Sequence, residues 1–379
     1  MLNTRTRSPK NARPTHESAE IEEPDGQGDL LLWKDHICRN ESSHVKLRPA
    51  PVAALLLAFC FVGMLFYTRG SSSHTVSSLL PLPRFGPKRP FGQPINTPWR
   101  TTEMAFASDG TMVFCSARKD KALAPGDVLD LYISTPDPTT GKYSEPVNMG
   151  PTVNSVPDTT GRTPRDGDDR EPWITPDGNS IYFKSTRLAR YDSPPAALPA
   201  SVAGKGPHND IFVTHKVDGV WQTPERLPEP VNIAGARDHC PMLLRDGKTL
   251  CWASLRPGGF GKSDIWCAVR SADGSYTEPV NAGPSVNTAA DEFHFQQDAQ
   301  GAWIYFTSFR PGGLSGAGDI WATLPDGRGG YGDAVNLGPR VNSVGVPNTC
   351  PAFMPNGSMA QFTMDADGEI DIWVNDVVR

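Results

Sequence analysis

The sequence predicts an all-β protein, a five-bladed β-propeller preceded by a single transmembrane helix. A strand–turn–strand unit recurs along residues 90–379, most of its turns carry Asp-Gly or Asn-Gly, and glycine and proline are abundant, at 36 and 37 of 379 residues. Short apolar runs separated by such residues are typical of strands joined by tight turns. With 38% hydrophobic and 21% charged residues, the chain can bury a large core.

Each repeat starts with two apolar strands joined by a short turn. Because Asp-Gly and Asn-Gly accept positive φ at both central positions, we expect type I′ turns here. Four copies align well, and the copy that starts at Glu292 has a longer turn. The five copies span residues 103–118, 171–187, 240–256, 292–310 and 350–364.

A third strand opens on an aspartate in every copy, and most copies then add a fourth. The third strands start at Asp130, Asp210, Asp264, Asp319 and Asp371. Four antiparallel strands in about 40–50 residues match one propeller blade. The last copy has no fourth strand, whereas Phe91–Asn96 resembles one and stands before the first copy. We therefore expect Phe91–Asn96 to complete the last blade and close the ring, which leaves no open sheet edge.

The N-terminal part divides into three segments. Residues 1–49 are polar and of mixed charge, which predicts a disordered cytoplasmic tail. Residues 50–68 carry no charge and are long enough to cross a bilayer, and residues 69–89 form a Ser/Pro-rich linker. Basic residues cluster before the apolar run, which places the propeller in the periplasm or outside the cell. We favour an uncleaved signal-anchor, with a cleaved signal peptide as the alternative.

Three motifs of the repeat resemble those of the TolB-type, WD-like propeller family. They are Ser-x-Arg at the end of the second strand, Asp-Ile-Trp at the start of the third and Glu-Pro-Val-Asn near the fourth, and they are most complete at residues 256–266 and 310–321. The resemblance covers about residues 90–379. It implies a propeller outside the cytoplasmic membrane that serves the cell envelope, with an envelope protein or glycan as its partner. The chain departs from TolB in its anchor, and we expect no separate N-terminal αβ domain.

Charge and cysteine content restrict the partners. The formal net charge of −6 argues against a nucleic-acid partner, which would require a basic face. The seven cysteines include no closely spaced pair, so we expect no disulfide framework and no zinc ribbon. On predicted strands, free cysteine behaves as a small buried hydrophobe. The cysteines on predicted strands are Cys115, Cys240, Cys251, Cys267 and Cys350. We expect no cofactor, with a divalent cation as the alternative.

Arginine and aspartate recur at fixed places, which favours a structural role over a catalytic one. The arginine of Ser-x-Arg is predicted to pair with the aspartate of the third strand in its blade. The pairs are Arg118–Asp130, Arg187–Asp210, Arg256–Asp264 and Arg310–Asp319. The third-strand aromatics are predicted to pack between blades. The glycine-rich segments 257–261 and 311–318 are predicted to be turns, because no helix follows them to bind a phosphate.

The first strand of a propeller blade lines the central channel. Counting back six residues from each turn gives one position per blade, which is Glu103, Glu171, Cys240, Glu292 or Cys350. The candidates for ligand binding are the polar residues beside them, Arg170, Asp238, His239 and His294. The candidates for a cation site are Cys240, Cys350, His239 and Glu292, because they offer thiol, imidazole and carboxylate donors.

Two functions are consistent with this pattern. The favoured one is a membrane-tethered module of the cell envelope that binds a protein or glycan and has no chemistry of its own. Long loops on a rigid scaffold carry binding specificity, and blade two has two of them, at 155–169 and 188–208. The alternative is a carbohydrate-active hydrolase. Its carboxylates would be Glu103, Glu171 and Glu292, with Asp291 as a modulator.

Overall fold

The structure is a computed structural model that describes residues 81–118, 129–155, 167–187, 209–233, 235–364 and 370–378. These residues belong to one compact unit, Ser71–Arg379. The predicted tail (1–49), the predicted transmembrane segment (50–68), most of the predicted linker and the loop 188–208 lie outside the described residues. Within the described ranges, no helix has the length and apolar character needed to span a bilayer.

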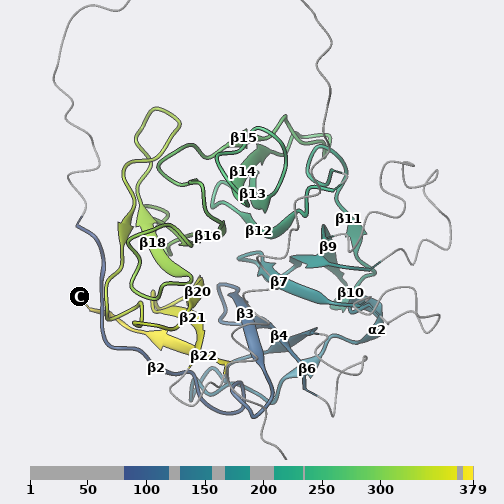
Figure 1. The fold of residues 1–379 in the computed structure, drawn as a ribbon. Coiled ribbons are helices and arrows are strands. Elements are labelled where there is room, and N and C mark those ends of the chain that lie inside the picture. The colour runs from purple at the N-terminus through teal and green to yellow at the C-terminus, as the bar shows by residue number, and fades with distance from the viewer. Residues whose placement is uncertain are drawn as a thin grey trace, which may run out of the picture. The chain divides into compact units, whose positions relative to one another are not determined.

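Five antiparallel sheets follow one another along the chain and form the blades of a propeller (Figure 1). Blade one consists of β3 (Thr101–Phe106), β4 (Met112–Ser116), β5 (Asp130–Ser134) and β6 (Val147–Asn148). Blade two consists of β7 (Asp169–Ile174), β8 (Ser180–Ser185), β9 (Asp210–Val217), β10 (Val220–Trp221) and β11 (Glu225–Arg226). A four-residue helix, α2 (Gly150–Val153), joins these two blades.

The remaining blades repeat the same arrangement. Blade three consists of β12 (His239–Leu243), β13 (Thr249–Ser254), β14 (Asp264–Val269) and β15 (Val280–Asn281). Blade four consists of β16 (Glu292–Gln297), β17 (Ile304–Ser308), β18 (Asp319–Thr323) and β19 (Val335–Asn336). Blade five consists of β20 (Asn348–Phe353), β21 (Met359–Met364), β22 (Ile370–Asn375) and β2 (Arg89–Pro90). The all-β, five-bladed architecture predicted from the repeat is confirmed.

The first strand of each blade faces the centre. These strands contact one another in the cyclic order β3, β7, β12, β16, β20 and back to β3, so the ring is closed (Figure 1). The core lies between neighbouring sheets rather than in the channel. Between blades one and two, for example, Val113 and Leu131 pack in one buried cluster with Ile181 and Phe183.

The ring is closed by the N-terminal segment, as predicted, although the pairing strand lies just before the expected one. The outer strand of blade five is β2, whose Arg89 and Pro90 pair with Val374 and Trp373 of β22. A second pair, β1 (Arg84–Phe85) with β23 (Val377–Val378), extends this contact. The predicted strand Phe91–Asn96 follows β2 and has a different role.

Asn96 belongs to a second motif that recurs in every blade, an asparagine that bridges the backbone of the third strand. Its amide donates to the carbonyl of Ile372 at 2.9 Å and accepts from the N–H of Ile372 at 3.2 Å. The other four bridges are Asn154 on Leu131, Asn232 on Ile211, Asn287 on Ile265 and Asn342 on Ile320. The N-terminal segment therefore supplies blade five with both its outer strand and its asparagine bridge.

The hairpin turns between first and second strands are not the predicted type I′ turns. Only the glycine has positive φ, as at Gly110 (88°) and Gly178 (71°), whereas the aspartate or asparagine before it does not. In blade one, Gly110 N–H donates to Ala107 and Ala107 N–H donates to Thr111, which closes a turn with one left-handed residue. The side chain of Asp109 also accepts from Thr111 N–H at 2.8 Å, which stabilises the turn.

The arginines of Ser-x-Arg have a structural role, but the predicted ion pairs with the third strand are wrong in three blades. The observed nitrogen–oxygen pairs are Arg187–Asp169 at 2.7 Å, Arg256–Asp238 at 2.9 Å and Arg310–Glu292 at 3.8 Å, all with an acid at the start of the first strand. Arg187 also donates to the carbonyl of Val153 (2.7 Å) in the connection from blade one and lies over the Phe183 ring. The guanidinium thus joins two blades.

The third-strand aspartates have other partners. Asp264 accepts from the amide of Asn281 at 2.8 Å and from Phe260 N–H, in the glycine-rich segment, at 2.6 Å. Asp210 instead pairs with Arg226 at 2.7 Å. The glycine-rich segments are turns, as predicted, and they use their backbone amides to hold a carboxylate of their own blade.

A disulfide joins Cys251 to Cys267, contrary to the expectation from cysteine spacing. The two residues stand opposite each other on β13 and β14. The two cysteines are 16 positions apart in the sequence, so the pair can be recognised only once the strand register is known. Cys115, Cys240 and Cys350 are free and buried, as expected of small hydrophobes.

Candidate functional site: the channel throat and funnel

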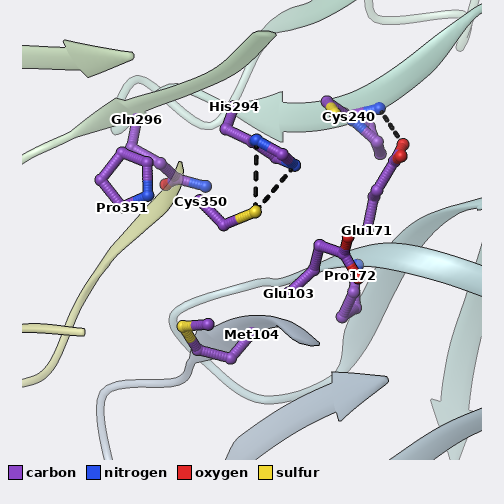
Figure 2. Close-up of a pocket in the computed structure, with 10 residues that line it drawn as sticks. Glu103, Met104, Glu171, Pro172, Cys240, His294, Gln296, Cys350 and Pro351 are labelled. Carbon is purple, nitrogen blue, oxygen red and sulfur yellow. Dashed lines mark hydrogen bonds between the residues drawn. The ribbon is translucent and has the colours of Figure 1, made fainter. Parts of the chain in front are cut away.

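One residue from each blade lines a small cavity in the central channel. These residues are Glu103, Glu171, Cys240, His294 and Cys350, and we call this set the throat (Figure 2). Each lies at the register shift of its blade's first strand, opposite the end of the second strand. The cavity at the throat has a volume of about 10 Å³. That volume accommodates about one water molecule or one small ion.

Blade four contributes His294 to the throat, and the prediction of Glu292 at this position is wrong. Glu292 stands opposite Ser308 and is fully buried. It accepts from the hydroxyls of Ser308 (2.6 Å) and Thr288 (2.7 Å) and pairs with Arg310. Counting back six residues from Asp298 gives Glu292, but the turn is marked by the left-handed Gly301 and not by Asp298.

The throat residues share an unusual backbone. Glu171, Cys240, His294 and Cys350 have φ between 50° and 57°, and the first strand bulges at each of them. A non-glycine residue in this left-handed region costs about 1–2 kcal/mol. Such strain concentrates at functional sites, where the surrounding structure holds it in place. The bulge also interrupts the alternation of the strand, so that in four blades the throat residue and the next residue both border the channel, whereas in blade four the second residue is Gln296.

Hydrogen-bonding side chains meet at close range in the throat. Cys350 Sγ lies 3.2 Å from Nε2 and 3.3 Å from Nδ1 of His294, and Cys240 N–H donates to Glu171 Oε2 at 2.8 Å (Figure 2). His239 stands just behind, with its Nδ1 3.2 Å from Cys240 Sγ and 3.4 Å from Glu171 Oε2. Two sets of three donor atoms, Glu103–His294–Cys350 and Glu171–Cys240–His294, each lie within 4.8 Å of one another.

Burial sets the protonation of the throat. It raises the pKa of Glu103, an effect that Arg170 opposes and Glu171 reinforces. Burial alone would raise the pKa of Glu171 too, but the charge and hydrogen bond of His239 outweigh it and hold this pKa well below the usual range. Burial lowers the pKa of His294 to about 4, so its imidazole is neutral at pH 7. It raises the pKa of Cys240 and Cys350 well above the usual thiol value.

The other predicted ligand-binding residues are part of the scaffold. Arg170 is buried and binds Asp168, with 2.6 Å between Nε and Oδ1. Asp238 is fully buried and accepts from Trp252 Nε1 and from Arg256, each at 2.9 Å. Asp291, the predicted modulator, is buried and accepts from Ser263 N–H at 3.2 Å. Among the four ligand-binding candidates, therefore, His294 belongs to the throat, His239 lies next to it, and Arg170 and Asp238 serve blade packing.

Towards the hairpin turns the channel widens into a second hollow that the sequence did not reveal. This cavity has a volume of about 120 Å³ and is lined by the ends of the first strands of all five blades. We call it the funnel. Its wall includes the rings of Phe106, Trp173 and Phe353, with the polar groups of Gln297 and Arg245 among them. These rings come two or three residues after the throat residue of their blade, a spacing that could have pointed to them.

Comparisons with known proteins find similar solved structures but no similar sequence. Neither a protein-family model nor a curated protein matches the sequence. Similar solved structures include TolB from Acinetobacter baumannii (14% identity, TM-score 0.40, 73% of this chain and 54% of that one) and a putative TolB from Agrobacterium tumefaciens (14%, 0.40, 77% and 89%). An α-L-arabinofuranosidase from Lactobacillus brevis is also similar (12%, 0.45, 74% and 91%).

The chain thus spans about half the length of the TolB structure from Acinetobacter baumannii. Its class is a five-bladed β-propeller, as its own sheets show, and the chain is similar to solved TolB structures, as the repeat motifs predicted. Identities of 12–15% carry no substrate or partner over to this chain.

Proposed function

We propose that this chain is a membrane-tethered, extracytoplasmic propeller that binds an envelope partner in its funnel. The observation that carries the proposal is the contrast between the two parts of the channel. The throat has room for about one ion or water molecule, whereas the funnel is wider and is walled by aromatic rings. Aromatic faces with nearby amide and guanidinium donors suit a sugar ring, so a glycan is favoured over a protein side chain. Binding there needs no cofactor.

The test is a glycan array probed with the full-length chain, together with a panel of chromogenic glycosides. We expect retention of a defined set of glycans and no turnover. Substitution Trp173→Ala should weaken retention by about tenfold or more, because it removes an aromatic anchor. Saturable binding of an envelope protein with no glycan retention would move the partner to the protein class. Turnover of a glycoside would contradict a pure binding role.

The membrane tether and the extracytoplasmic location are part of this proposal. They are supported by the uncharged run 50–68 and by the disulfide Cys251–Cys267, because disulfides persist in oxidising compartments. In cells that produce the full-length chain, rapid alkylation and mass spectrometry should find Cys251 and Cys267 linked. A variant that lacks residues 1–69 should show both as free thiols. Two free thiols in the full-length protein would argue against export.

One observation favours the alternative, a carbohydrate-active hydrolase. Glu103 and Glu171 line the same throat, and burial and neighbours push their pKa values apart, upward for Glu103 and downward for Glu171. Such a divergence is how one carboxyl group becomes a general acid and another a base or nucleophile. In this function, Glu103→Gln and Glu171→Gln would each abolish turnover and leave glycan retention intact. The matched control is Glu292→Gln, which changes a carboxylate outside the throat.

A further inference from the structure

The throat brings together the donor types that a borderline-soft cation prefers. Two thiols, an imidazole and two carboxylates from five different strands border a space for about one particle. Thiolate and imidazole ligands select zinc-like metals over magnesium or calcium, which take oxygen ligands. The described residues outside the throat offer no second group of three such donor atoms at comparable spacing.

We propose that the throat binds one divalent cation of the zinc class through Glu171, Cys240, His294 and Cys350. His294 is common to both sets of donor atoms that lie within 4.8 Å of one another, so it occupies the centre of the site. Ligand atoms around a tetrahedral zinc ion lie about 3.3–3.8 Å apart. Within the set Glu171–Cys240–His294 the donors therefore need to approach one another by about 1 Å, and Cys350, which lies 3.2 Å from His294 Nε2, has to turn towards them by side-chain rotation.

The surroundings already orient these ligands. His239 and Cys240 N–H both contact Oε2 of Glu171, so that this carboxylate is held in place next to the thiol. The ring of His294 packs edge-on against Phe293, with 4.8 Å between centroids. Groups that orient metal ligands in this way typically change affinity by about 10–100-fold when they are removed.

Binding of the cation displaces protons and involves no redox change. A Zn²⁺ ion that binds Cys240 and Cys350 as thiolates releases the two thiol protons to solvent, because only the thiolate is a ligand. The ion would link blades two, three, four and five across the channel. Metal binding is therefore also expected to raise the unfolding temperature of the protein, since only the folded ring presents the four ligands together.

The experiment uses the full-length chain, reduced, stripped with a chelator and checked by mass spectrometry for free thiols at Cys240 and Cys350. Titration with Co²⁺ followed by optical absorption reports thiolate-to-cobalt charge transfer, and competition with a chromogenic chelator gives the affinity for Zn²⁺. We expect one ion per chain with a thiolate band. We expect Cys240→Ser, Cys350→Ser and His294→Gln each to weaken binding by about tenfold or more. His215→Gln is the matched control, because His215 lies outside the throat on β9, and it should bind like the parent.

The outcomes separate a throat site from adventitious binding. Loss of the thiolate band in the three throat variants, with metal-free unfolding curves that match the parent, supports the proposal. Three different side chains guard against a folding defect in any one variant. The proposal is overturned by the absence of saturable binding, by a cobalt spectrum without a thiolate band, or by binding that persists in all throat variants.

Discussion

Substitution Asp168→Asn is expected to destabilise the ring by about 3–5 kcal/mol, because it leaves two buried cations without their charged partner. Asp168 has a side chain that is 5% exposed, and it binds Arg170 at 2.6 Å and Lys184 at 3.1 Å. Both cations are buried to a similar degree. Thermal or urea unfolding of the full-length chain, parent against variant, measures the loss.

The effect of Asp168 should depend on pH in a defined direction. Burial alone would raise the pKa of Asp168, but the charges of Arg170 and Lys184 outweigh it and hold the pKa well below the usual range. A carboxyl group whose pKa is depressed in the folded state contributes stability above its unfolded pKa of about 3.9 and loses that contribution as pH falls. The stability gap between parent and variant should be constant from about pH 7 to 5 and shrink below about pH 4.

An exposed ion pair provides the control for Asp168. Asp376 pairs with Arg89 at 3.1 Å, and both side chains are more than half exposed. Exposed pairs contribute about 0–1 kcal/mol, so Asp376→Asn should unfold almost like the parent. Equal losses in Asp168→Asn and Asp376→Asn would show that burial of the charges does not control their contribution.

Deletion of residues 85–97 is expected to abolish cooperative folding of the propeller. The segment supplies the outer strand β2 of blade five, the bridge from Asn96 to Ile372, and the fully buried Ile95. Burial of one large apolar side chain contributes about 1.5–3 kcal/mol, and each unpaired backbone group costs about 1–3 kcal/mol. Their sum approaches the total stability of a typical domain, about 5–15 kcal/mol.

A milder variant tests the same closure in a folded protein. Asn96→Ala removes only the bridge and should cost about 1–3 kcal/mol, because the N–H of Ile372 loses its partner, whereas the carbonyl of Ile372 keeps the N–H of Phe91. Asn287→Ala removes the equivalent bridge within blade three, on Ile265, and should have a similar effect. Circular dichroism during heating distinguishes the variants. A deletion variant that melts like the parent would refute closure by the N-terminal segment.

The repeat made the architecture predictable from the sequence. Each blade depends on local patterns, namely two apolar strands, a turn glycine and an Asp-opened third strand, so the number of blades and the closing segment could be inferred. The same patterns could not separate the asparagine of the outer strand, such as Asn281, from the asparagine that bridges the third strand, such as Asn287. Asn96 was therefore interpreted as part of an outer strand, although its side chain bridges Ile372 and β2 precedes it.

The site was less predictable because it depends on register and on contacts between blades. Two extra residues between Asp298 and Gly301 shift the count in blade four and put Glu292 where His294 stands. Left-handed glycines are a safer reference than aspartates, because a turn requires their conformation. The partners of Arg187 and the bond between Cys251 and Cys267 depend on which residues face each other, which no short sequence pattern states.

The most direct test of the binding function is to measure glycan retention by the full-length parent, Trp173→Ala and Val280→Ala under identical conditions. Trp173 lines the funnel, whereas Val280 is exposed on the outer strand of blade three. We predict that Trp173→Ala loses about tenfold or more in affinity at a temperature where it is still folded, and that Val280→Ala binds like the parent. Equal binding by all three proteins would contradict a partner site in the funnel.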